Sequence, residues 1–247
     1  MSYSAIAECY DALNSHVDYE AFASFLNREI RAGGISDGSI VLDLACGTGN
    51  ITLPLLKCGY DMIGVDLSGD MLNIARNKKG GDKVLWLCQD MRSFELYGTV
   101  GAVVCCLDSI NYLTSRNGLS KCFSLVHNYL DPNGIFIFDV NTPYKFEHIY
   151  GNNHYILEDD GIYCGWQNYF DKKSGLCDFE LSFFYENGDG SYTCLDETQT
   201  ERCYSIKTVT DLLIKNGFEI IKIISDFEGS PLKDTDERAY FVCRAIK

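Results

Sequence analysis

The stretch Val41-Leu42-Asp43-Leu44-Ala45-Cys46-Gly47-Thr48-Gly49 constrains the fold of this chain more than any other. Strand-type residues run into a turn with two glycines, and the residues from Asn50 onward predict a helix. Glycine adopts positive φ without steric cost and lets the backbone approach a ligand closely. A strand, a glycine-rich turn and a helix N-terminus together form a nucleotide-type cradle at the carboxyl edge of a parallel sheet. The alternative is a turn that needs glycine only for its own geometry.

The segments around this stretch alternate between strand and helix. The run at 101–107 is almost wholly apolar, which is typical of a central parallel strand buried on both faces. Helical segments are predicted over 3–33, 50–56, 70–77 and 118–130. This alternation predicts an α/β fold with a doubly wound parallel sheet. Its five predicted strands are Ile40–Leu44, Tyr60–Val65, Val84–Leu87, Gly101–Leu107 and Ile135–Val140.

The alternation of strand and helix stops after Asn141. Alternating, aromatic-rich runs separated by turn residues predict an antiparallel meander. Beyond it, 205–216 predicts a helix, and 218–225 and 238–246 predict two more strands. We therefore expect one domain from residues 1–142 and 205–247, with residues 143–204 inserted as a lid over the carboxyl edge. The strands predicted for the lid are His154–Glu158, Ile162–Phe170, Cys177–Tyr185 and Tyr192–Gln199.

Composition narrows the function classes. The 247 residues carry a net charge of −14, from 35 acidic and 21 basic residues. A field of this sign repels a phosphate backbone, so a small or cationic substrate fits better than nucleic acid. We find no apolar run long enough to span a membrane and no secretory signal. The 12 cysteines form no C-x-x-C pair and no metal-type spacing with the four histidines, so we expect a cytoplasmic protein with reduced thiols and no metal site. The sequence leaves the oligomeric state open, with a homodimer as one alternative.

Two acids indicate what the glycine turn holds. Asp66 ends the second strand about 20 residues beyond Gly47, the separation at which a carboxylate meets a ribose diol. Dinucleotide-binding proteins share this feature, but their fingerprint needs a third glycine where this chain has Thr52. Asp43, which precedes the turn, suits a cation better than a pyrophosphate. An adenosyl ligand other than a dinucleotide therefore fits the sequence better.

Several further motifs follow in order along the chain: Asp43–Gly49, Gly64–Ser68, Asp70–Leu72, Gln89–Met91, Leu107–Tyr112 and Leu130–Phe136. Together they resemble the motifs of class I S-adenosylmethionine-dependent methyltransferases. The resemblance implies a Rossmann-like methyltransferase fold of seven strands, whose last strand, around Phe241, runs antiparallel. The whole chain resembles a subgroup of small, mostly uncharacterised bacterial enzymes with an antiparallel insertion after the fifth strand.

The resemblance implies S-adenosylmethionine as the cofactor and the residues that bind it. The glycine turn would face the methionine part, and the acid that ends the second strand would bind the ribose hydroxyls. The acid after the third strand would accept a hydrogen bond from the adenine amino group, with apolar residues flanking the ring. The end of the fourth strand would lie near the sulfonium, and an aromatic residue near the N-terminus would cover the cofactor. The implied set is Tyr10, Asp43, Ala45, Gly47, Gly49, Asp66, Leu67, Met71, Asp90, Met91 and Leu107. For its apolar members, plain core packing is the alternative.

The implied reaction is in-line transfer of a methyl group to the N or O nucleophile of a small-molecule acceptor. It needs alignment and exclusion of water above all. An acceptor that must lose a proton would use a nearby acid or phenol, and we name Asp108, Asn111 and Tyr204 as catalytic candidates. Two alternatives stay open. One is a nicotinamide-dependent oxidoreductase, which the turn and Asp66 also allow, and the other is a non-catalytic S-adenosylmethionine-binding protein.

Overall fold

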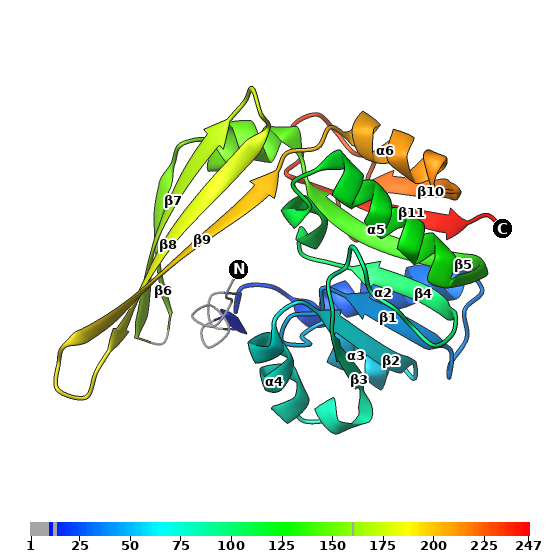
Figure 1. The fold of residues 1–247 in the computed structure, drawn as a ribbon, viewed down its shortest axis with the longest axis horizontal. Coiled ribbons are helices and arrows are strands. Elements are labelled where there is room, and N and C mark those ends of the chain that lie inside the picture. Colours follow the sequence, from blue (N-terminus) through cyan, green and yellow to red (C-terminus); the bar gives the residue numbers. More distant parts are fainter. Residues whose placement is uncertain (1–9, 12–13, 160) are drawn as a thin grey trace.

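The computed structural model describes residues 10–11, 14–159 and 161–247 (Figure 1). Its main body is a seven-stranded sheet of β1 (Ile40–Leu44), β2 (Asp61–Asp66), β3 (Leu85–Cys88), β4 (Val100–Cys105), β5 (Leu130–Asn141), β10 (Phe218–Ile224) and β11 (Arg238–Ala245). The spatial order is β10-β11-β5-β4-β1-β2-β3. The first five strands pair in parallel, and β11 is antiparallel to both β5 and β10. The predicted doubly wound, mostly parallel sheet is confirmed.

Helices cover both faces of this sheet. Side chains of α2 (Tyr19–Ala32), α3 (Thr52–Lys57) and α4 (Gly69–Asn77) pack into the core on one face. Those of α5 (Arg116–Tyr129) and α6 (Ile206–Lys215) pack on the other. Strand β4 is buried along its whole length between these layers, which explains its continuous apolar sequence.

A second sheet of four antiparallel strands follows β5, formed by β6 (His154–Asp159), β7 (Ile162–Asp171), β8 (Leu176–Glu186) and β9 (Tyr192–Arg202). All four strands expected from the alternating pattern are present. Figure 1 shows these long, twisted strands standing beside the main sheet, with β9 leading back into α6. The second sheet therefore lies over one edge of the main sheet without extending it.

Element boundaries differ from the prediction where a side-chain cap sets the start of a helix or the pairing between strands sets the start of a strand. Helix α5 begins at Arg116, earlier than predicted, because the Ser115 hydroxyl accepts the Gly118 N–H at 3.0 Å as an N-cap. Strand β5 includes the predicted turn at 131–134, but its pairing with β4 skips those residues. The turn is therefore an irregularity at the start of the strand.

The N-terminal and linking segments complete the fold. Of the helix expected over 3–33, residues 1–9 and 12–13 lie outside the described residues, and α2 begins at Tyr19 after the Asp18 cap. A π-helical segment, η3 (Lys145–Tyr150), connects β5 to the second sheet and was not predicted. No helix among the described residues is long and apolar enough to cross a membrane, and every cysteine among them is free.

Gly64 in β2 allows a test of how tightly this strand packs against Trp86 of β3. A Cβ there would lie 2.4 Å from Trp86 Cε3, so we expect Gly64→Ala to lower the free energy of unfolding by about 1–3 kcal/mol through overpacking. The control is Gly69→Ala, because Gly69 begins α4 and a Cβ there meets no atom of a described residue within 4 Å. That variant should be as stable as the parent or more so. Urea denaturation of both variants checks this, and equal stabilities would contradict it.

Candidate active site

A cleft of about 840 Å³ lies between the carboxyl edge of the main sheet and the second sheet. One wall comes from the ends of β1, β2 and β4, and the other comes from β7, β8 and β9. Except for Asp43 and Gly49, all the predicted cofactor-binding residues line this cleft: Tyr10, Ala45, Gly47, Asp66, Leu67, Met71, Asp90, Met91 and Leu107. The fold thus gathers residues from 10 to 107 on one surface.

The glycine turn and Asp66 form one hydrogen-bonded unit in this cleft. Both carboxylate oxygens of Asp66 accept backbone N–H groups at 2.8 Å, one from Gly47 and one from Ser68. The turn places Ala45 at φ +60° and Gly47 at φ +53°, a backbone region that residues other than glycine rarely adopt. Among the described residues, a Cβ on Gly47 would meet only Tyr10 Cε1, at 4.0 Å. The turn therefore leaves open space where a ligand can approach the backbone.

The two exceptions lie behind the turn. A Cβ on Gly49 would sit 2.8 Å from Trp86 Cη2, so Gly49 lets the turn pack closely against β3. Asp43 is buried and borders a separate cavity of about 30 Å³ behind the turn. The Thr52 hydroxyl donates to its Oδ2 at 2.5 Å. Thr52, which replaces the third glycine of the dinucleotide fingerprint, is thus the hydrogen-bonding partner of Asp43. Burial raises the pKa of Asp43 to about 7.

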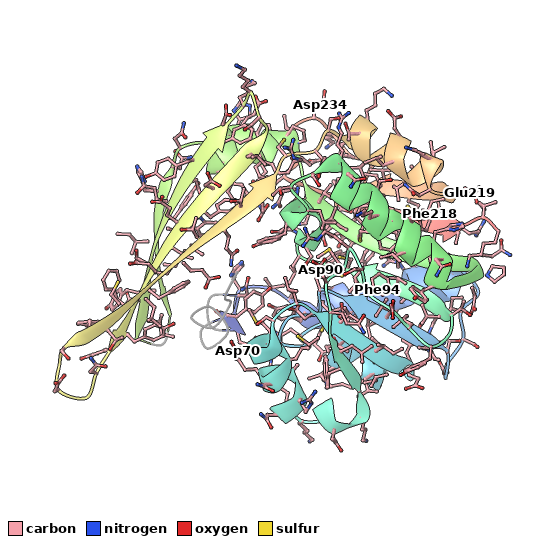
Figure 2. All side chains as sticks on the ribbon, viewed as in Figure 1. Asp70, Asp90, Phe94, Phe218, Glu219 and Asp234 are labelled. Carbon is pink, nitrogen blue, oxygen red and sulfur yellow. The ribbon has the colours of Figure 1, made fainter. Side chains whose placement is uncertain are left out.

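The end expected to hold adenine is lined by apolar side chains and one acid. Leu67 is 50% exposed, whereas Met71, in the first turns of α4, is buried. Asp90, which follows β3, forms an ion pair with Arg92. The hydrogen bond from Arg92 lowers the pKa of Asp90. Figure 2 labels Asp90, which is half-buried, and Asp70 at the start of α4.

The N-terminal residues Tyr10 and Asp11 are anchored to the glycine turn. Asp11 accepts hydrogen bonds from Thr48 Oγ1 at 2.6 Å and Asn50 Nδ2 at 2.8 Å, and it pairs with Lys78 at 2.6 Å. These contacts hold Tyr10 next to the turn, where an aromatic residue was expected from the sequence. The sequence prediction included Tyr10 but missed the anchoring contacts of Asp11, because Lys78 belongs to a different segment.

The end of β4 is held in a rare conformation by a buried acid. Leu107 and Asp108 adopt φ of +56° and +53°. Their backbone N–H groups donate to the two carboxylate oxygens of Asp139, each at 2.8 Å. Arg238 of β11 forms ion pairs with both Asp139 and Asp108. The sequence prediction missed Asp139 and Arg238, although a single carboxylate within the apolar run Ile135–Val140 is a signal of this kind.

Two of the three catalytic candidates join the sheets together. Asn111 is fully buried, donates to the Arg202 carbonyl at 2.9 Å and accepts the Asn141 N–H at 3.0 Å. The Tyr204 hydroxyl is buried and donates to the Leu113 carbonyl. Among the described residues, neither side chain lines the cleft. This geometry favours a structural role for both and leaves Asp108 as the candidate that reaches the cleft.

The second sheet and η3 add charged groups beside Asp108. Glu201 of β9 lines the cleft, is 3% exposed and shares a hydrogen bond with Asp108. Lys145 of η3 lines the same region and donates to Asn141 Oδ1 at 3.1 Å. Burial and the charge of Asp108 raise the pKa of Glu201 well above its usual value. The sequence prediction named Asp108 but neither Glu201 nor Lys145, because the members of this cluster come from separate elements.

The chain is similar to known proteins in sequence and in fold. The family described as a methyltransferase domain matches residues 41–134. The chain is 32% identical over 249 residues to the "Putative methyltransferase YqeM" of Bacillus subtilis (strain 168), an alignment that covers 100% of this chain and 98% of the relative. A crystal structure of an S-adenosylmethionine-dependent methyltransferase from Clostridium acetobutylicum superposes with a TM-score of 0.89 at 30% identity, covering 99% of both chains.

A third relative shares a shorter region. It is a dTDP-3-amino-3,4,6-trideoxy-alpha-D-glucopyranose N,N-dimethyltransferase from Streptomyces venezuelae, 35% identical over 133 residues. The match covers 53% of this chain and 55% of the relative.

The raised pKa of Asp43 predicts how stability depends on pH. The folded state keeps this proton up to about pH 7, whereas the unfolded chain loses it near pH 4. Raising the pH through this window therefore stabilises the unfolded state relative to the folded one. Asp43→Asn removes the effect, so its stability should rise relative to the parent between pH 4 and 8, by up to about 4 kcal/mol. Urea denaturation at pH 5 and 8 measures the difference, and a gap that does not change with pH would contradict the prediction.

Proposed function

Because the chain belongs to the class I S-adenosylmethionine-dependent methyltransferases, we propose that it transfers the methyl group to an amine or hydroxyl of a small-molecule acceptor. The single observation that carries this proposal is the continuous cleft. It runs from the glycine turn at Gly47 to the polar cluster at Asp108 and Glu201. Its volume of about 840 Å³ lies at the upper end of the range for small-ligand sites, so it has room for the cofactor and a small acceptor together.

The residues of the cleft fit S-adenosylmethionine. The open space above Gly47 and the Asp66 carboxylate, which two backbone N–H groups hold in place, form a cradle of the kind that accepts a ligand close to the backbone. In this proposal the turn from Ala45 to Gly47 holds the methionine part and Asp66 binds the ribose hydroxyls. The adenine then lies between Leu67, Met71 and Met91, with Asp90 at its amino group, and Leu107 borders the sulfonium.

The bound cofactor supplies an activated methyl group, so this chain's own task is to align the acceptor and exclude water. The second sheet covers the cleft with Leu157, Trp166, Phe179 and Phe183. The residues at the end of β4 are fixed by Asp139. Asp108 is the acid placed to receive a proton from the acceptor.

Two observations support a small acceptor. The relative from Streptomyces venezuelae is named for a small nucleotide-linked amino sugar, and the net charge of −14 disfavours nucleic acid. Membership in the methyltransferase family excludes the nicotinamide-dependent oxidoreductase that the glycine turn and Asp66 had also allowed. Family membership also favours an enzyme over a non-catalytic binding protein.

A direct test incubates the protein with S-adenosylmethionine and a panel of small amines and alcohols, and follows the formation of S-adenosylhomocysteine and methylated product by mass spectrometry. One methylated small molecule is the expected result. Binding of the cofactor without turnover of any panel member, combined with methylation of RNA or protein, would overturn the proposal.

For the cofactor end, we expect Asp66→Ala to weaken S-adenosylhomocysteine binding by about 1–3 kcal/mol, since charge-assisted hydrogen bonds to the ribose would be lost. Asp70→Ala is the matched control, because Asp70 is also an acid near the start of α4 but does not line the cleft. Its affinity should stay close to the parent value. Titration calorimetry measures both affinities, and thermal melting confirms that each variant is folded. Equal losses in the two variants would count against the assigned position of the ribose.

A further inference from the structure

Asp108 and Glu201 form a carboxyl pair that bridges the two sheets. Asp108 follows β4 of the main sheet, and Glu201 lies in β9 of the second sheet. The two side chains share a hydrogen bond, which requires one of them to carry a proton. Both residues line the cleft. The pair is therefore placed where an acceptor molecule would meet both sheets.

The proton resides on Glu201. Burial opposes ionisation of Asp108, but the charges of Arg238 and Lys145 outweigh it and hold the pKa of Asp108 below its usual value. Glu201 is less well compensated: its hydrogen bond from Asn141 Nδ2 is 3.2 Å long and neutral, and the charge of Lys145 lowers its pKa by less than burial and Asp108 raise it. Burial and the charge of Asp108 therefore raise the pKa of Glu201.

Counted over the described residues, this cluster has one cation fewer than it has carboxyl groups. Three carboxyl groups, from Asp108, Asp139 and Glu201, face two cationic side chains, Arg238 and Lys145. Arg238 is already committed to ion pairs with Asp139 and Asp108. A third cation in the cleft would allow all three carboxyl groups to be ionised without net charge. The other titratable groups that act on this cluster include Tyr10, Tyr150, Tyr240, Cys105, Cys106, Cys177 and the exposed Glu237.

An aromatic wall borders the pair. Tyr150, Trp166 and Phe179 all line the cleft, with ring centroids 5.0–6.0 Å from one another. Lys145 Nζ already lies 5.0 Å from the centre of the Tyr150 ring. Aromatic faces attract ammonium groups in this way, so the wall and the carboxyl pair favour the same kind of ligand.

We propose that the methyl acceptor is a primary or secondary amine, that it enters as an ammonium ion between Asp108 and Glu201, and that this carboxyl pair takes up the proton which the amine must lose. The inference rests on the proposed function and narrows its acceptor class. Glu201, which binds and orients the amine from the second sheet, is a specificity-determining residue of the site.

The step balances in atoms and charge. Entry of the ammonium displaces the proton shared by the pair into solvent, which leaves Asp108 and Glu201 both ionised. The ammonium then passes one proton to the pair and exposes its nitrogen lone pair. That lone pair forms the new N–C bond to the methyl group, and the electrons of the breaking C–S bond go to sulfur. The products are a methylated ammonium ion, a neutral thioether and a pair that again holds one proton.

Titration calorimetry on the complex with S-adenosylhomocysteine tests this inference without requiring turnover. The probes are small amines, including 2-phenylethylamine, and alcohols with the same carbon skeletons. Titrations near pH 7 in buffers of different ionisation enthalpy count the protons released. We expect amines to bind more tightly than their matched alcohols and to release about one proton each as Glu201 ionises.

The Glu201→Gln variant tests whether Glu201 is the source of the released proton. The amide still donates a hydrogen bond to Asp108 but cannot ionise, so we expect affinity for the amines to fall at least roughly tenfold and proton release to disappear. Glu180→Gln is the control, because Glu180 is an exposed acid of β8 that does not line the cleft. It should match the parent, and Glu201→Asp should restore part of the proton release.

The outcomes separate the two proposals. A protein that fails to bind S-adenosylhomocysteine would contradict the proposed function itself. A protein that binds it but binds alcohols as tightly as amines, or binds no amine, would overturn the inference and leave a hydroxyl acceptor in its place. Undiminished proton release in Glu201→Gln would show that the amine loses its own proton on entry, and would also overturn the inference.

Discussion

The site depends on the buried carboxylate of Asp139. It accepts the N–H groups of Leu107 and Asp108 and pairs with Arg238, so one side chain ties together β4, β5 and β11. Positive φ at two successive residues other than glycine costs on the order of 1 kcal/mol or more for each. The strain persists because Asp139 satisfies both N–H groups at once. As a result, Asp108 is held with its carboxylate at the cleft.

A similar logic governs the opposite end of the cleft. Asp66 holds the glycine turn through the Gly47 N–H, while Thr52 donates to the buried Asp43. At both ends a carboxylate fixes a backbone turn at the tip of a parallel strand. The second sheet is joined to this edge by hydrogen bonds from Asn111 and Tyr204 to backbone carbonyls. Residues that resemble catalytic groups in sequence thus hold the cleft together.

Local patterns explain which parts were predictable. Strand–helix alternation and the glycine turn are short-range signals, so the parallel strands of the main sheet and the four strands of the insertion followed from them. The residues expected to bind the cofactor came from the resemblance of short motifs to a methyltransferase family. Helix boundaries were missed where a single side-chain contact sets the end of the helix, as the Ser115 cap does for α5. Asn111 and Tyr204 were named for their chemistry and their position after a strand or sheet, but sequence cannot reveal that their polar atoms are already bonded.

The sequence alone determined the fold class, the family and the acids at the strand ends, because these depend on periodicity and on motifs of a few residues. Only the tertiary structure decided what surrounds the acceptor. Glu201 reaches Asp108 because β9 docks on the main sheet, and Arg238 reaches Asp139 because β11 pairs with β5. Such contacts join residues far apart in the chain, and the pKa values that follow from them depend on burial. Local sequence patterns predict neither these contacts nor the burial.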